Sequence, residues 1–201
     1  MEIMIRNTMP EDYIPISKIL DDEWRFHIYS EEKWLEMSEY YLLHCIDGAN
    51  LSETLLIDGE PKGILVIREM GTDTIDVSEQ CSKLDESIRN DPNYGYYLKD
   101  LDNLYDVYKG FVKESKIPEW AELRLLIISK DCKGLGLGRI LMSEAEKRIK
   151  EHGMSGAFFY TDTDCNFGFY DHLGAERIGS KMIICAGEDL EVYGYRLTFD
   201  N

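Results

Sequence analysis

Three glycines alternate in the segment SKDCKGLGLGR, residues 129–139, and a lysine and an arginine flank them. Each glycine in an ordered element costs roughly 0.5–1 kcal/mol relative to alanine, so the pattern needs a compensating role. An apolar run precedes the segment and a helical pattern follows it. The first N–H groups of a helix lack internal partners and carry partial positive charge, which suits a phosphate. We therefore expect a phosphate-binding loop, because a tight turn without a ligand would need only one glycine.

Two common phosphate-binding loops do not match this segment. The dinucleotide motif GxGxxG, counted from Gly134, requires glycine where the chain has Arg139. The P-loop requires a Lys-Ser or Lys-Thr pair, which does not follow the glycines. A different kind of phosphate loop is therefore indicated.

Other residues near the loop carry groups that could take part in chemistry. Glu122 and Arg124 are two apart in an expected strand, so their side chains project from one face, which also suits an ordinary ion pair. An adjacent arginine would lower the pKa of the glutamate. Cys165 has no histidine next to it in the sequence, which favours a structural thiol over a nucleophile.

The composition limits the class of protein. The 201 residues are 44% hydrophobic and 30% charged, which suits one globular domain with or without an insertion. The net charge of −17 argues against nucleic-acid binding and mildly favours cationic partners, although solubility is the simpler explanation. The scattered cysteines and histidines predict neither disulfides nor a metal site. Without a signal-peptide pattern or an apolar run near ~20 residues, we expect a cytoplasmic protein.

Helical and strand patterns alternate along the chain. A strand is expected at 3–8, then a helix opened by Pro10 and a second helix from Ser30. Asp58-Gly59 predicts a hairpin, which Pro61 should lengthen into a longer loop. The later strands and helices are expected at 121–129, 139–153, 156–161, 165–174 and 177–199, with a final turn at 187–189. A mixed, largely antiparallel sheet flanked by helices fits this order.

Residues 72–118 differ from the rest, since they are acidic, rich in tyrosine and helical in period. We expect an inserted pair of helices. Tyrosine faces beside carboxylates such as Asp100, Asp102 and Asp106 would suit an ammonium group, so changing the last two to asparagine should raise the KM of a cationic substrate. An amphipathic hairpin with packed tyrosines and solvated acids is the favoured alternative.

The segment KGLGLG resembles the acetyl-CoA pyrophosphate loop of the GNAT superfamily of N-acetyltransferases, commonly written Q/R-x-x-G-x-G/A. Lys133 takes the first place and Gly136 and Gly138 the two small positions. IRNTMPEDYIPISKIL resembles the family's first strand and helix, and FYDHLGA its closing motif. The resemblance implies a single α+β domain over 1–201, with a mostly antiparallel sheet of about six to seven strands, flanking helices and a helical insertion at about 72–118.

The same resemblance implies direct transfer of an acetyl group from acetyl-CoA to a primary amine. Tyr170 matches the family's usual general acid. The alternative is a structural role, in which its ring only packs beside Phe169. Glu122 is the expected general base, directly or through water, and a plain salt bridge is an equally weighted alternative. Asn166 resembles a CoA-contacting asparagine of the family, although it stands four residues before the tyrosine, where a spacing of seven residues is commoner. The expected cofactor contacts are Leu126, Ile127, Ile128, Lys133, Gly134, Leu135, Gly136, Leu137, Gly138, Arg139 and Asn166.

The implied partners are acetyl-CoA and an amine, with no metal, nucleic acid or membrane and with room for a homodimer. A catalytically silent acyl-CoA-binding sensor or interaction module is the main alternative. An enzyme that uses a longer acyl-CoA, or a protein N-terminus as acceptor, is another. A protein that only binds acyl-CoA does not need a residue that donates a proton to the departing thiolate, so the presence of Tyr170 favours an enzyme.

Overall fold

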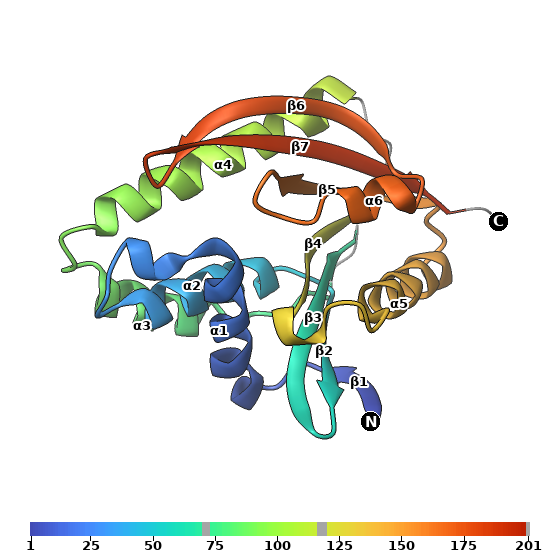
Figure 1. Ribbon diagram of the computed structural model, residues 1–201, viewed down its shortest axis with the longest axis horizontal. Helices are drawn as coiled ribbons and strands as arrows, with labels where there is room; N and C mark the ends of the chain where they lie inside the picture. Colours follow the sequence, from blue (N-terminus) through green and yellow to red (C-terminus); the bar gives the residue numbers. More distant parts are fainter. Residues whose placement is uncertain (70–72, 116–119, 200–201) are drawn as a thin grey trace.

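A computed structural model of the protein describes residues 1–69, 73–115 and 120–199. Within these ranges a seven-stranded sheet has the order β1-β2-β3-β4-β5-β7-β6 (Figure 1). Its strands are β1 (Ile3–Asn7), β2 (Leu51–Ile57), β3 (Glu60–Arg68), β4 (Ala121–Ile128), β5 (Gly156–Asp162), β6 (Glu176–Cys185) and β7 (Glu188–Thr198). Neighbouring strands are antiparallel except for the parallel pair β4–β5. The predicted mixed, mostly antiparallel sheet is confirmed.

Helices cover both faces of this sheet. They are α1 (Tyr13–Trp24), α2 (Trp34–Ile46), α3 (Ser78–Ile88), α4 (Tyr94–Ser115), α5 (Leu137–Glu151) and α6 (Gly168–His172). Alternate residues of β3 face opposite sides, since Ile64 and Val66 pack in the cluster that includes α1 and α2, whereas Leu65 and Ile67 pack in the cluster that includes α5. The strand therefore lies at the centre of two hydrophobic layers.

Strand β4 reverses the direction of its side chains at Arg124. Its pairing with β3 skips this residue, which is the extra residue of a β-bulge. Leu123, before the bulge, packs on the α5 side, and Leu125, after it, packs on the α1–α2 side. Among the described residues, β4 pairs with β5 over its first two positions alone. The rest of β4 thus has a free edge where the two strands separate.

The two inserted helices are confirmed as α3 and α4, while the predicted limits at 72 and 118 lie outside the described residues. Helix α4 joins two distant parts of the core. Tyr97 and Leu101 pack with α1 and α2, while Val107 and Phe111 pack against β7. Figure 1 shows the helix crossing behind β6 and β7. The insertion therefore holds the N-terminal helices and the C-terminal strands together.

The hairpin predicted at Asp58-Gly59 is confirmed, but the longer loop expected there and the position of the last turn were wrong. Strand β3 starts at Glu60, directly after a two-residue turn, and Pro61 lies within the strand beside a bulge. The last hairpin turns at Ala186-Gly187 rather than at 187–189. In both hairpins the two turn residues have positive φ, the geometry that closes two-residue loops tightly.

Phe111 lies in a notch that two glycines create. Gly179 of β6 pairs with Gly194 of β7, and a Cβ added at Gly179 would lie 2.8 Å from Cδ1 of the Phe111 ring. Such a distance is far below van der Waals contact, so any side chain here must displace the ring. The glycine pair therefore lets α4 lie close to the sheet.

We expect Gly179→Ala to lower the free energy of unfolding by about 1–3 kcal/mol, because the methyl group overpacks the Phe111 contact. Urea denaturation measures this loss. In a Phe111→Ala background the methyl group has room, so the same change should cost much less. An equal cost in both backgrounds would show that the ring is not the cause.

Candidate active site

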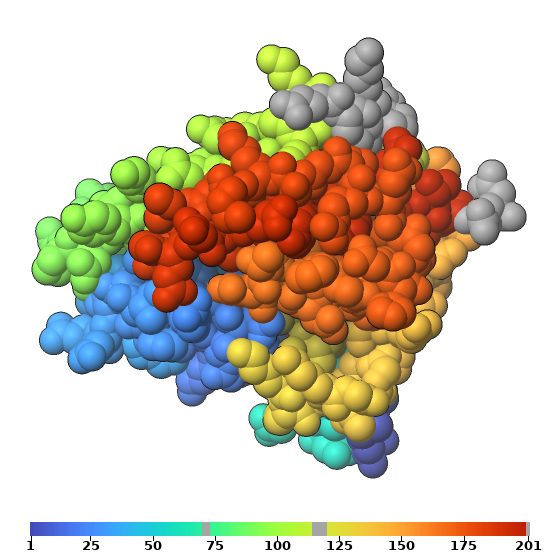
Figure 2. All heavy atoms as spheres, turned by 45° about the horizontal axis from the view of Figure 1, so that its top comes forward, coloured from blue at the N-terminus to red at the C-terminus, as the bar shows by residue number. Residues whose placement is uncertain are grey.

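A cavity of about 490 Å³ opens where β4 separates from β5. One side is formed by β4, the glycine loop and α6, and the other by α1, α2, α4 and the end of β6. Figure 2 shows the glycine loop (yellow) next to the segment around α6 (orange), with the N-terminal helices (blue) bordering them. The volume is that of a small-molecule or cofactor site.

The three glycines of the loop serve different purposes. Gly134 and Gly136 have φ of 83° and 76°, a left-handed conformation that other residues adopt at a cost. Gly138 instead permits close packing, because a Cβ there would lie 3.3 Å from Cζ of Phe169. Helix α5 begins directly after Gly136, and all three glycines line the cavity. The start of a helix, with its unpaired N–H groups, therefore faces the cavity.

The predicted cofactor contacts come together around one end of this cavity. Leu126, Ile127 and Ile128 line it from β4, Asn166 from the loop before α6, and the rest from the glycine loop and the start of α5. The exception is Leu135, which is not among the lining residues and whose side chain is exposed. Lys133 and Arg139 add two positive charges at this end, as a phosphate ligand would require.

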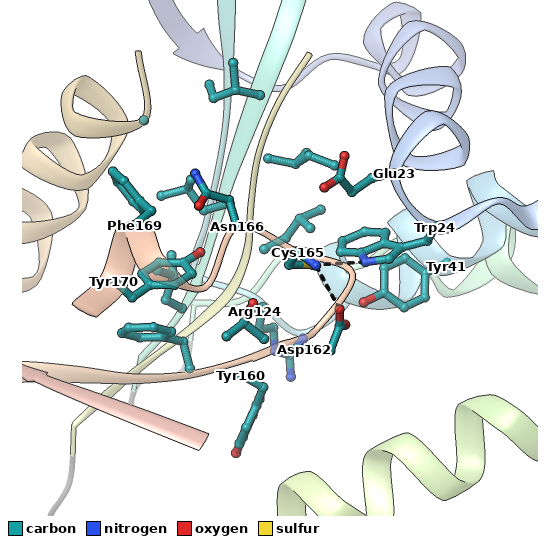
Figure 3. A pocket seen from close by; sticks show the side chains of 18 of the residues that line it. Glu23, Trp24, Tyr41, Arg124, Tyr160, Asp162, Cys165, Asn166, Phe169 and Tyr170 are labelled. Atoms are coloured by element: carbon teal, nitrogen blue, oxygen red, sulfur yellow. Dashed lines mark hydrogen bonds between the residues drawn. The ribbon is translucent and has the colours of Figure 1, made fainter. Parts of the chain in front are cut away.

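Tyr170 lines the cavity from α6, and Figure 3 shows its hydroxyl pointing inward. Its ring packs against Phe159 and Phe169, with centroids 4.5 and 5.2 Å away. The next residue, Asp171, accepts a 2.7 Å hydrogen bond from the hydroxyl of Tyr195, which ties α6 to β7. Burial raises the pKa of Tyr170 above its ordinary value, so the hydroxyl stays protonated and can donate.

Glu122 lies outside the set of residues that line the cavity, whereas Arg124 lines it. Nε of Arg124 donates to Glu122 over 3.3 Å, and Nη1 donates to the carbonyl oxygen of Asp47 over 2.6 Å. The expected ion pair is therefore present, and its arginine is held by backbone as well. This placement does not favour Glu122 as the general base, because the arginine stands on the cavity side of the pair.

Asp162 was not among the predicted site residues. It is the last residue of β5 and lines the cavity with only 7% of its surface exposed. Its Oδ1 accepts hydrogen bonds from the backbone N–H groups of Asp164 and Cys165, at 3.0 and 3.1 Å. Burial raises its pKa above the ordinary aspartate value. The available signal was an acidic residue at the end of the buried strand GAFFYTD.

Cys165 also lines the cavity, and its sulfur accepts a 3.3 Å hydrogen bond from Nε1 of Trp24 (Figure 3). Burial, together with the nearby Asp162 carboxylate, raises the pKa of the thiol well above its usual range. A protonated thiol is a poor nucleophile. These contacts agree with a structural thiol that joins α1 to the loop before α6.

The inserted helix α4 contributes only part of the expected pocket. Asp100 lines the cavity and accepts hydrogen bonds from the Tyr29 hydroxyl and the backbone N–H of Ala186, at 2.8 and 2.7 Å. Asp102 and Asp106 are exposed and are not among the lining residues, so they do not form the pocket, and the favoured alternative of solvated acids describes these two positions. Helix α4 packs with the face that carries Asp100 toward the cavity, so Asp102 and Asp106 lie on its exposed face.

No helix in the described ranges combines the length and apolar character needed to cross a membrane. Over the same part of the chain, no group of three or more histidine, cysteine or acidic residues could hold a metal ion.

Residues 64–175 match the family model described as "Acetyltransferase (GNAT) family". The chain belongs to this GNAT family. The match runs from β3 through α6 and includes the glycine loop, Asp162 and Tyr170. No curated protein matches the chain.

Solved structures share the fold of this GNAT protein. The ribosomal-protein-S18-alanine N-acetyltransferase from Escherichia coli is 11% identical with a TM-score of 0.58, covering 100% of this chain and 96% of that one. An N-acetyltransferase from Staphylococcus aureus Mu50 is 12% identical with a TM-score of 0.55, and both chains are covered completely. A GNAT family acetyltransferase from Brucella melitensis in complex with acetyl-CoA is 15% identical with a TM-score of 0.51, covering 100% and 90%.

The left-handed conformation of Gly136 leads to a stability prediction. Gly136→Ala should lower the free energy of unfolding by roughly 1–2 kcal/mol, because a Cβ is strained at this φ. Gly110→Ala is the matched control, since Gly110 lies in α4 with open space around it. That change should stabilise the protein by about 0.5–1 kcal/mol. Chemical denaturation measures both, and equal effects would contradict the strain argument.

Proposed function

We propose that this GNAT-family protein transfers the acetyl group of acetyl-CoA directly to a primary amine. The observation that carries the proposal is one continuous cavity with two different ends. The glycine loop, Lys133 and Arg139 form a cationic end, and Asp100 and Asp162 stand among aromatic rings at the other. Tyr170 lines the same cavity. Such a site can hold an anionic donor and an amine with a proton donor within reach of both.

The donor would bind along the glycine loop and β4. The pyrophosphate would receive hydrogen bonds from the first N–H groups of α5 and charge from Lys133 and Arg139. The pantetheine arm, which carries amide groups, would pair with the free edge of β4 at Leu126 and Ile128, where β5 has turned away. The acetyl-CoA bound by the Brucella melitensis neighbour supports this donor.

The transfer requires a neutral amine and a proton for the leaving thiolate. The amine nitrogen attacks the thioester carbonyl carbon, the C–N bond forms, and the C–S bond then breaks. Tyr170 would donate its hydroxyl proton to the departing sulfur and regain a proton from the nitrogen of the intermediate. The sum is an amide and free CoA, and the tyrosine is restored.

Acetyl-CoA should stabilise the folded protein against heat. A ligand at ~100 times its Kd adds about 2.7 kcal/mol, which raises the Tm of a chain of this size by roughly 5–10 °C. Differential scanning fluorimetry with acetyl-CoA, and with NADH and ATP as controls, measures this rise. The absence of a rise with acetyl-CoA, or an equal rise with the controls, would refute the assignment of the donor.

Tyr170→Phe should retain acetyl-CoA stabilisation and lose roughly 10²–10⁴-fold in kcat, since it removes the proton donor but leaves the ring packing. Release of free CoA, followed with a thiol reagent over a panel of amines, measures turnover. Tyr96→Phe serves as the control, because it removes the hydroxyl of an exposed tyrosine on α4 that does not line the cavity. Equal turnover by wild type and Tyr170→Phe would remove Tyr170 from the mechanism. Acetyl-CoA binding by a wild type that acetylates no amine would instead support the silent acyl-CoA-binding module.

A further inference from the structure

We propose that the Asp162 carboxylate binds the ammonium group of the acceptor and removes its proton before the attack on acetyl-CoA. This inference rests on the acetyl transfer proposed above and specifies its substrate class. The acceptor is a primary amine that is protonated in solution, and its ammonium group enters a buried pocket with a carboxylate and aromatic walls.

The position of Asp162 supports this role. It ends β5 at the point where that strand has left β4, so its side chain lies in the wedge between the two strands. Both backbone hydrogen bonds from the following loop go to Oδ1. The second oxygen, Oδ2, accepts neither of them. The Cys165 thiol also hydrogen-bonds to the carboxylate. Oδ1 thus shapes the loop, and the carboxylate as a whole borders the cavity, where a ligand can reach it.

The charge of Asp162 has no cationic partner among the residues that the structure describes. The neighbouring acids are compensated differently, because Asp164 pairs with Arg25 at 3.2 Å and Glu23 pairs with Lys130 at 3.3 Å. Arg124, which lines the cavity from β4, is engaged by Glu122 and by backbone carbonyls, and Arg139 lines it from the start of α5. A buried carboxylate without a partner is costly, and an ammonium ligand would offset that cost.

The surroundings of Asp162 suit an ammonium group. Figure 3 shows Asp162 near Tyr41 and Cys165, with the indole of Trp24 on the same side of the cavity. Aromatic faces attract cations, and their attraction grows where water is excluded. The titratable groups that interact with the Asp162 charge are Tyr41 on α2, Tyr108 on α4, Asp164 and Cys165 on the following loop, Tyr170 on α6 and Cys185 on β6.

The Asp162 charge also contributes, after burial and Cys165, to the raised pKa of Tyr170, so the carboxylate and the proposed acid influence one another. The ammonium would transfer one proton to Asp162, and its freed electron pair would attack the thioester carbon. Tyr170 would then protonate the sulfur as the C–S bond breaks and recover a proton from the nitrogen, which is positively charged after the attack. Asp162 would finally release its proton to solvent, so that one ammonium and one acetyl-CoA yield one amide, one free CoA and one proton.

Asp162→Asn is the decisive variant, because the amide oxygen can still accept the two loop hydrogen bonds while the charge and the basicity are lost. The control Asp106→Asn makes the same change on the exposed face of α4. Glu122→Gln tests the competing base. The amine panel contains putrescine, spermidine, benzylamine and phenethylamine, and free CoA release is measured from about pH 5 to 10.5 for the best amine.

In wild type, kcat/KM should rise as Asp162 ionises, reach a plateau, and fall as the amine loses its proton near pH ~10. Asp162→Asn should lack this plateau and rise with unit slope towards pH ~10, because only the neutral amine can then react. At pH 7 its kcat/KM should be roughly 10²–10⁴-fold lower, and Asp106→Asn should match wild type. Asp162→Glu should recover part of the plateau.

A binding measurement tests the same proposal without turnover. Benzylamine and benzyl alcohol are titrated calorimetrically into the CoA-bound protein, and the amine should lose at least ~10-fold in affinity in Asp162→Asn while the alcohol does not. Equal amine binding by wild type and Asp162→Asn, an unchanged pH profile, or loss of the plateau in Glu122→Gln instead would overturn the proposal. A wild type that ignores acetyl-CoA would contradict the proposed function, and the same amine titration into the ligand-free protein would then decide the role of Asp162.

Discussion

The separation of β4 from β5 is the constraint on which the site depends. Two parallel strands would normally continue to exchange hydrogen bonds, yet these two part after the first two positions of β4. The bulge at Arg124 lies at this point and changes the faces that the later residues of β4 present. The separation therefore frees a strand edge for a ligand and leaves the end of β5 free to carry Asp162, and the bulge beside it places an arginine in the cavity.

The rest of the fold encloses this wedge and gives its two ends opposite character. The glycine loop and the start of α5 supply N–H groups and basic side chains at one end, although the whole chain carries a net charge of −17. Helix α4 and the N-terminal helices supply aromatic rings and carboxylates at the other. Because Phe111 fastens α4 to the glycine pair of β6 and β7, the insertion forms a fixed wall of the cavity.

Features encoded locally could be predicted from the sequence. The glycine loop could be predicted because positive φ angles and close packing restrict these positions to glycine, which leaves a visible pattern in the sequence. Tyr170 could be predicted to lie near the loop because it belongs to a short motif. Which of Glu122 and Arg124 lines the cavity was not predictable, because it depends on a β-bulge that the periodicity of the strand sequence does not reveal. Asp162 was missed because its burial arises only when β5 meets helices from distant parts of the chain.

The burial of Asp162 also links the site to the stability of the fold. Its folded-state pKa is raised, so the folded protein holds this proton more tightly than the unfolded chain. The corresponding stability is present at low pH and is lost as the pH rises through the folded-state pKa. Above that pKa the fold carries an ionised carboxylate at a cost in stability, and the backbone hydrogen bonds to Oδ1 offset part of it. A bound ammonium group would offset more of this cost. Asp162 would therefore destabilise the ligand-free protein and stabilise its complex with a cationic acceptor.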